Sequence, residues 1–283
     1  MNITQEALKA FGLSRNPFQG EIQSAKDVFY SVEHLYVKNT LEQAARLPGC
    51  LTAVVGEVGS GKTTVKNNFI EQSETDGVTV IQPFMLDKTK LAVPHLEEAI
   101  VWALNPEAKL FRSREARNRQ LAKMLQASTK AGGRHVLIIE EAQDLSAMVL
   151  KVLKRLVEIK TGNKSCISVV MIGQPELLRR LDASRNYHLR ELINRTTVAE
   201  IAPLQTDKEI RQYLELKFSN CRGLFGCDAY SAILDVLSES QNKRRHSAAY
   251  PLAINNLVAA ALNSAAELGL DIVSADVLRA TKK

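Results

Sequence analysis

The chain has 283 residues, of which 45% are hydrophobic and 24% are charged, a balance typical of a folded globular protein. Lysine and arginine total 37 against 31 acidic residues, so the formal net charge of +6 permits a polyanionic partner without requiring one. Disordered, collagen-like and disulfide-rich classes are excluded by this composition. The four cysteines show no metal-ligand spacing, and no signal peptide or membrane span is expected, which predicts a cytoplasmic protein with reduced thiols.

Short apolar runs alternate with helical patterns over the first two hundred residues, as expected of a parallel sheet wrapped by helices. Helices are predicted over 32–46, 62–72, 94–104, 114–131 and 147–160. Strands are predicted over 51–55, 78–81, 136–139, 167–172 and 197–201. Trp102 lies in the amphipathic pattern of helix 94–104, which predicts a core position for its side chain.

The pattern changes after Pro203. Thr206 and Glu209 form a capping box that opens a helix, and further helices are predicted near 228–239, 251–267 and 274–281 with no comparable strand. We therefore expect three parts: an N-terminal helical segment packed on the core over 1–48, an α/β core over 49–204, and a small all-helical domain over 205–283.

The most specific motif is a phosphate-binding loop that follows a strand and opens a helix. It satisfies GxxxxGK[ST] in full. Its glycines let backbone N–H groups curl around phosphates, the lysine reaches the outer phosphate oxygens, and the threonine hydroxyl serves Mg²⁺. The residues predicted to bind ATP are Gly56, Glu57, Val58, Gly59, Ser60, Gly61, Lys62, Thr63 and Thr64.

Two acids follow the apolar strand 136–139, at the edge where open α/β sheets bind ligands. We expect Glu140 to join Thr63 on the magnesium side and Glu141 to polarise the attacking water. The first acid of such a motif is usually aspartate, so the longer Glu140 leaves the magnesium geometry open. The alternative is that both are solvated acids at a strand end.

Several motifs together give the chain a family resemblance. Phe11-Gly-Leu, Pro17-Phe18, the phosphate loop, Glu140-Glu141-Ala-Gln and Ile172-Gly-Gln-Pro-Glu-Leu resemble the ExeA/TniB/MuB-like branch of AAA+ ATPases. The resemblance implies a P-loop AAA+ core with a helical lid.

The same resemblance implies roles for individual residues. Gln174 would sense the γ-phosphate, and Arg190 or Arg195 would be the finger that reaches a neighbouring subunit's nucleotide. The family's lid arginine is missing near Leu252. Either Lys243, Arg244 or Arg245 substitutes for it, or hydrolysis is slow.

Two basic segments are candidate DNA contacts, with solvated helix faces as the alternative. Contacts by these side chains would neutralise phosphates without reading bases. The predicted DNA-binding residues are Arg112, Arg114, Arg117, Arg119 and Lys123 in the first segment and Lys151, Lys154 and Arg155 in the second.

These observations favour an ATP hydrolase that binds double-stranded DNA, assembles with further copies of itself and stimulates a transposase. One alternative is the secretion-type ATPase of the same branch. Those proteins usually continue into a membrane span, whereas this sequence ends at Lys283, so we expect the transposition role. A second alternative is a nucleotide-gated interaction module that does not hydrolyse ATP.

Overall fold

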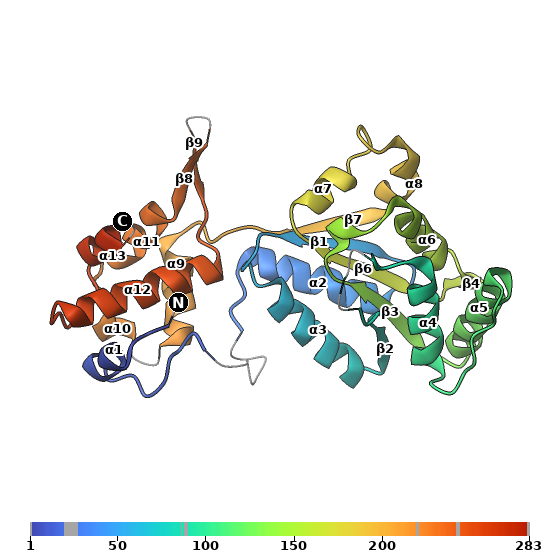
Figure 1. Cartoon of the computed structure of the whole chain (residues 1–283), viewed down its shortest axis with the longest axis horizontal. Helices are drawn as coiled ribbons and strands as arrows, with labels where there is room; N and C mark the ends of the chain where they lie inside the picture. The colour runs from blue at the N-terminus through green and yellow to red at the C-terminus, as the bar shows by residue number, and fades with distance from the viewer. Residues whose placement is uncertain are drawn as a thin grey trace. The chain divides into compact units, whose positions relative to one another are not determined.

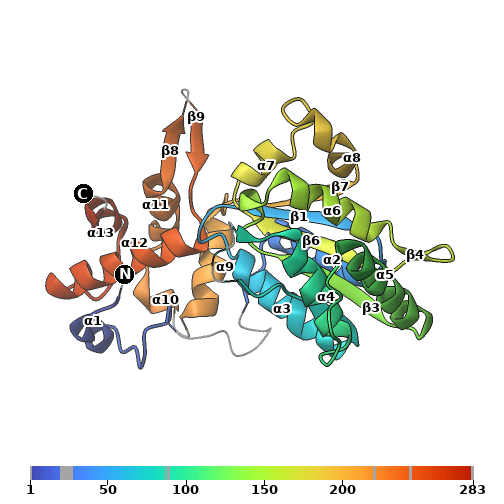
Figure 2. The ribbon, with the colours of Figure 1, turned by 45° about the vertical axis from the view of Figure 1, so that its right-hand side comes forward.

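The computed structural model describes residues 2–19, 28–85, 87, 90–218, 221–241 and 244–281. The chain divides into two compact units, both drawn in Figure 1 and Figure 2. The first unit comprises Met1–Ser31, Val58–Gly61 and Ala202–Lys283, and the second comprises Val32–Glu57 and Lys62–Ile201. No helix in the described part of the chain is long and apolar enough to cross a bilayer.

The second unit is built on a five-stranded sheet with the order β2-β3-β6-β1-β7, in which every neighbouring pair is parallel. Its strands are β1 (Leu51–Gly56), β2 (Val78–Ile81), β3 (Arg134–Ile139), β6 (Ser168–Gly173) and β7 (Thr196–Ile201). Strands β1 and β6 are buried along their whole length, as expected when helices cover both faces. The predicted α/β sheet is therefore confirmed.

Helices of the second unit cover this sheet (Figure 1). They are α2 (Val32–Arg46), α3 (Lys62–Thr75), α4 (Val93–Leu104), α5 (Arg114–Lys130), α6 (Ala147–Val157), α7 (Glu176–Arg180) and α8 (Arg190–Ile193). Alternate strand residues, such as Leu137 and Val169, join the side chains of α4, α5 and α6 in one core cluster. Helix α2 contacts strands β1, β3, β6 and β7 from the other face.

Two details of the second unit differ from the sequence-based prediction. Helix α6 ends at Val157, because the chain then forms a short hairpin of β4 (Lys160–Thr161) and β5 (Lys164–Ser165). Trp102 is 47% exposed, so its predicted core position is wrong. The buried face of α4 is taken by neighbours such as Ile100 and Val101.

The first unit is mainly helical. Its helices are α1 (Gln5–Ala10), α9 (Asp207–Lys217), α10 (Cys221–Leu224), α11 (Ala229–Val236), α12 (Pro251–Glu267) and α13 (Ala275–Thr281). The prediction of an entirely helical C-terminal part is wrong in one respect, because β8 (Ser238–Gln241) and β9 (Arg244–Ser247) pair as an antiparallel hairpin. This polar stretch has no apolar face that a helix could bury, and pairing satisfies its backbone groups.

The N-terminal segment also differs from the expected division. Ile3 and Ala7 belong to the core cluster of the C-terminal helices, and the Thr4 amide donates to Asn263 Oδ1 at 2.8 Å. The Phe18 ring meets the Phe218 ring edge-on, with centroids 5.4 Å apart. Among the described residues of segment 1–48, α2 packs on the sheet while α1 packs on the C-terminal helices, so the expected packing of the whole segment on the α/β core is replaced by two separate attachments.

Candidate nucleotide-binding site

The phosphate loop connects β1 to α3. Gly59 and Gly61 have φ angles of 77° and 97°, in the left-handed region that glycine adopts without strain. Lys62 begins α3, and its Nζ donates to the carbonyl oxygens of Gly56 and Glu57 at 2.6 and 2.8 Å. Burial lowers the pKa of Lys62 below its usual value, while Glu141 and Glu57 act in the opposite direction.

These features fit a bound nucleotide phosphate. The loop provides glycine turns at the amino end of the 14-residue helix α3, where free N–H groups and the helix dipole favour an anion. The Lys62 ammonium is held by carbonyls of the loop itself, which keeps it at the place where a phosphate would bind. ATP is therefore compatible with the residues present.

Leu252 stands where the family resemblance expects the lid arginine. Within the first unit, its amide donates to the Gly59 carbonyl at 3.2 Å. A Cβ added to Gly59 would lie 2.3 Å from Leu252 Cβ, so glycine is required there by space as well as by φ. Of the suggested substitutes, Lys243 lies outside the described residues, as do the side chains of Arg244 and Arg245.

The two predicted acids follow β3 and have different surroundings. Glu140 Oε1 lies 2.8 Å from the Nζ of Lys66, which is one helical turn beyond Lys62. Glu141 has a φ of 51°, and it is the only described non-glycine residue in the left-handed region. Such a conformation costs energy and is often found at functional sites. The chain therefore separates the two carboxylates and gives each a distinct set of partners.

Glu141 is held by two amide side chains. Its Oε2 accepts from Gln143 Nε2 at 2.7 Å and from Gln174 Nε2 at 3.4 Å. Gln143 Oε1 in turn accepts from the backbone amide of Gln174 at 3.1 Å. A Cβ at Gly173 would approach Gln143 Oε1 to 2.8 Å, so this close packing depends on glycine. The expected base and the expected sensor thus meet at the carboxyl ends of β3 and β6.

Gln143 had no predicted role, although it belongs to the motif that carried the resemblance. It lies in the 3-10 turn η3 (Ala142–Asp144) that follows the acids. Its amide can donate to one residue and accept from another, and here it links Glu141 to Gln174. The only sequence signal for this role is an amide two residues after the second acid.

The oxygen ligands expected for magnesium are present. Thr63 lies in the first turn of α3, and hydroxyl and carboxylate oxygens suit a hard cation such as Mg²⁺. Glu140 departs from this pattern, because an ammonium already lies beside its carboxylate. No cluster of three histidine, cysteine or acidic side chains that could hold a metal occurs among the described residues.

The two candidate finger arginines are engaged with neighbouring side chains. Arg195 donates to Glu158 at 2.8 Å and lines a cavity of about 450 Å³. The guanidinium carbon of Arg190 lies 4.5 Å from the centre of the Tyr187 ring, a cation–π contact. Both arginines are exposed, and each contacts a neighbouring side chain of the second unit.

Arg195 lies at the end of the sheet opposite the phosphate loop. It directly precedes β7, whose first residue, Thr196, pairs with Leu51 at the start of β1. The phosphate loop begins at Gly56, at the other end of β1. Five residue steps along a strand span roughly 16 Å, which is beyond the reach of one arginine side chain.

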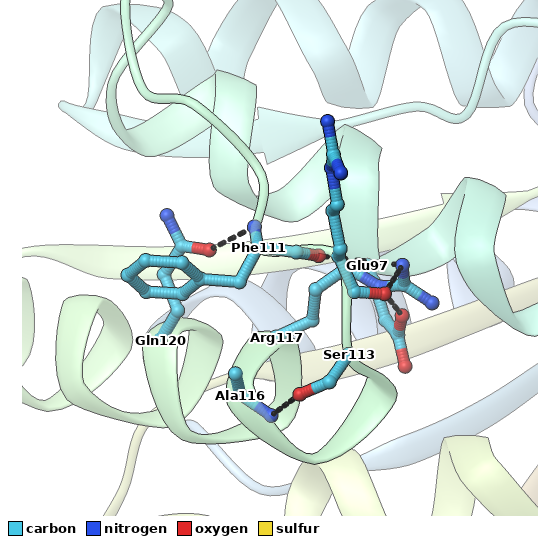
Figure 3. Close-up of polar contacts among 7 residues, drawn as sticks. Glu97, Phe111, Ser113, Ala116, Arg117 and Gln120 are labelled. Atoms are coloured by element: carbon cyan, nitrogen blue, oxygen red, sulfur yellow. Dashed lines mark hydrogen bonds and ion pairs between the residues drawn. The ribbon is translucent and has the colours of Figure 1, made fainter.

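Arg117, one of the predicted DNA contacts, forms a buried ion pair. Its Nε lies 2.8 Å from Glu97 Oε2, and the Glu97 side chain is only 4% exposed (Figure 3). Arg117 also donates to the carbonyl of Arg112 at 3.2 Å, and Gln120 Nε2 donates to the carbonyl of Lys109 at 3.0 Å. These contacts fasten the loop before α5 and favour an interior role for Arg117, whose side chain is 21% exposed.

The other predicted DNA contacts fall into two groups. Arg119 pairs with Glu115 at 3.1 Å, and Lys154 pairs with Glu158 at 3.5 Å and with Glu191. The remaining five are exposed and form no ion pair within the described part of the chain. They are Arg112, Arg114, Lys123, Lys151 and Arg155.

The fold and the site resemble those of one class of protein. A five-stranded parallel sheet with a phosphate loop after one strand and paired acids after another matches the fold of P-loop AAA+ ATPases. Residues 48–181 match the family model described as AAA domain.

The chain is also similar in sequence to an individual protein. General secretion pathway protein A of Aeromonas hydrophila is 32% identical over 193 residues, covering 66% of this chain and 33% of the relative. The chain therefore spans about a third of that relative's length.

Solved structures share the fold at low sequence identity. The Aeropyrum pernix ORC2 protein, in ADPNP–ADP complexes, has a TM-score of 0.58 and 14% identity, covering 94% of this chain and 71% of that one. Drosophila ORC bound to DNA has a TM-score of 0.64 and 14% identity, covering 99% of this chain and 66% of that one.

Proposed function

We propose that this chain is an ATP hydrolase that assembles on double-stranded DNA without sequence preference and regulates a transposase. The observation that carries the hydrolase part is the cluster of Glu141, Gln143 and Gln174 at the carboxyl edge of the sheet. An ATP hydrolase that responds to its nucleotide needs one residue that activates water and another that detects the γ-phosphate. Here these residues are Glu141 and Gln174, and Gln174 donates a hydrogen bond to Glu141.

The chain's own residues divide the work of hydrolysis. Lys62 binds the β- and γ-phosphate oxygens, and Glu141 accepts a proton from the attacking water. Gln143 donates a hydrogen bond to the Glu141 carboxylate, so the carboxylate is oriented before the nucleotide arrives. Thr63 would contribute to a Mg²⁺ ion, which when bound neutralises charge on the phosphates.

Completion of the site by a second copy is part of the proposal. Because Arg195 lies at the end of the sheet away from its own phosphate loop, it would serve the nucleotide of a neighbouring subunit. An arginine supplied in this way stabilises the charge of the transferring phosphoryl group. Hydrolysis would then require an assembly of several chains.

The DNA part of the proposal rests on the exposed cations. Arg112, Arg114, Lys123, Lys151 and Arg155 leave their charges to solvent, and Lys151 and Arg155 lie one turn apart on α6. Such side chains neutralise phosphates without reading bases. Drosophila ORC, which shares the fold, has been solved bound to DNA.

The transposase is proposed from the motif resemblance to the TniB and MuB proteins. A second candidate role is favoured by the 32% identity to general secretion pathway protein A, a protein named for a secretion pathway. Both roles use the same nucleotide site, so they differ in the partner. Exposed cations that prove essential for DNA binding favour the first role.

The test is fluorescence anisotropy of a labelled random-sequence duplex, titrated with ATP, with ADP and with a slowly hydrolysed analogue over a salt series. We expect binding with ATP that is lost in Lys62→Ala. The double variant Lys151→Ala/Arg155→Ala should reduce the slope of log affinity against log salt by about 1.8, since each phosphate contact contributes about 0.9.

The control is Lys9→Ala/Lys208→Ala, which removes the same net charge from exposed positions of the first unit. It should leave the slope unchanged. DNA binding that is absent in every nucleotide state would refute the DNA and transposase part. If the chain binds DNA, a second experiment adds the ATP-bound wild type to a candidate transposase and measures strand transfer. Strand transfer should rise, and the Glu141→Gln variant should prolong the stimulation.

A further inference from the structure

Lys66 is an unusual residue for its position. It lies on the buried face of α3 beside Val65 and Phe69, and it is 9% exposed. A buried ammonium group is costly unless an opposite charge compensates for it. Its partner is Glu140, whose Oε1 lies 2.8 Å away. The pair thus joins helix α3 to the end of strand β3.

The Lys66–Glu140 pair lies next to the residues expected to bind nucleotide and magnesium. Lys66 follows Lys62 by one helical turn, and it follows Thr63 by three residues, so all three project from neighbouring positions of α3. Glu140 is the acid expected on the magnesium side of the site. The carboxylate that would attract a divalent cation therefore already carries a resident positive charge.

We propose that Lys66 is a built-in cation that neutralises Glu140, so that ATP binding to this chain depends only weakly on Mg²⁺. The proposal rests on the nucleotide-binding part of the proposed function and not on hydrolysis, DNA binding or the transposase. A carboxylate paired with an ammonium offers less negative potential to a second cation. The attraction for Mg²⁺ then comes mainly from the phosphates and Thr63.

A purely structural pair would behave differently. If Lys66 only fastened α3 to β3, its replacement by an uncharged side chain would change stability and leave the effect of Mg²⁺ on nucleotide affinity as it was. If Lys66 competes with the metal, the same replacement frees the Glu140 carboxylate. The Glu140 side chain is 35% exposed, so water can solvate it when the ammonium is gone.

The experiment measures the dissociation constant of a fluorescent ATP analogue with Mg²⁺ and with EDTA, and takes the ratio of the second to the first. Lys66→Met should raise this ratio by roughly fivefold or more, since a unit charge at about 4 Å is worth about 1 kcal/mol even at the dielectric constant of water. Lys66→Arg, which keeps the charge, should leave the ratio at the wild-type value. Thermal melting without nucleotide reports folding of each variant.

A double-mutant cycle locates the effect at Glu140. Glu140→Gln alone should not raise the ratio, because it removes the carboxylate and leaves the Lys66 ammonium unpaired. In the Lys66→Met background the same change should abolish the gain. Lys66→Gln keeps a hydrogen-bond donor without the charge, and it replaces Lys66→Met if that variant melts early. A ratio that is unchanged or lower in both uncharged variants overturns the proposal.

The failures of the two proposals are separable. A wild-type chain that binds no nucleotide under either condition refutes the proposed function and, with it, any role for Lys66 in nucleotide binding. A wild-type chain that binds ATP while the Lys66 variants keep its magnesium ratio refutes only the resident-cation proposal. Hydrolysis is not measured in any arm, so a slow enzyme gives the same information.

Discussion

Replacement of Arg117 by methionine tests whether this residue belongs to the interior or to a DNA-binding surface. Methionine retains most of the buried aliphatic stem and leaves the Glu97 carboxylate, which is 4% exposed, without its cation. The Glu97 Oε1 atom already has no hydrogen-bond partner among the described residues, so no second group can compensate. Loss of one member of a buried pair costs about 3–5 kcal/mol.

The lower end of that range applies here, because the Arg117 side chain is 21% exposed. A loss of about 3 kcal/mol should lower the melting temperature of the second unit by roughly 6–12 °C, at 2–4 °C for each kcal/mol. Differential scanning calorimetry measures this shift. Glu97→Met/Arg117→Met removes both charges and should recover most of the stability.

The matched control is Arg119→Met. Its partner is Glu115, and the two side chains are 70% and 81% exposed, so the change should cost under about 1 kcal/mol. The interior assignment would be refuted if Arg117→Met had the melting temperature of the wild type and bound DNA more weakly, with a smaller salt dependence. That result would return Arg117 to the set of DNA contacts.

Three further predictions concern the site and the core. Gln143→Leu should lower ATP turnover by about ten- to a hundredfold with unchanged nucleotide affinity, because only the orientation of Glu141 is lost; a parallel loss of affinity in the titration would contradict this. Phosphate release should be absent in Arg195→Ala and in Glu141→Gln measured alone, and should return when the two variants are mixed, because one supplies an intact Glu141 and the other an intact Arg195. A mixture that stays inactive would indicate an arginine that serves its own chain. Burial lowers the pKa of His135 in the folded chain, so the unfolded chain binds more protons in acid. The contribution of His135 to the free energy of unfolding, measured by urea denaturation, should be complete above about pH 6.5 and fall below it, and His135→Gln should remove this pH dependence.

The parallel sheet could be predicted from the sequence because its strands are short apolar runs. A run such as Val136–Ile139 is buried on both faces, so it needs no polar alternation and stands out from the helices beside it. The phosphate loop could be predicted for a similar reason, since glycine at Gly59 and Gly61 marks backbone angles that other residues avoid. Both features are local in the chain.

Features that depend on distant partners could not be predicted. Lys66 and Glu140 are 74 residues apart, and nothing near either position indicates that they pair. Arg117 looked like its neighbour Arg119, and only the position of Glu97 on the buried face of α4 separates their surroundings. Charge runs in a sequence therefore show how many cations a helix carries and do not show which of them are available to a ligand.

The same limit applies to the N-terminal segment. Ile3 and Phe18 are apolar residues that must be buried, but the sequence does not state which core receives them. They pack on the C-terminal helices, where the Phe18 ring meets the Phe218 ring edge-on and the Thr4 amide donates a hydrogen bond to Asn263. The bounds of helix 32–46 were predictable from the sequence, whereas α1 and the assignment of elements to units were not.

The distribution of the site over the sheet has a consequence for regulation. Lys62, Glu141 and Gln174 lie at the carboxyl edge, and Arg195 lies at the other end of the same sheet. A chain built in this way would carry one incomplete site and one complementing arginine, so turnover would depend on neighbours and not on nucleotide alone. Because Arg195 is paired with Glu158, a neighbour would also have to offer more negative charge than one carboxylate, which the phosphates of ATP do. Hydrolysis would then follow assembly and could not precede it.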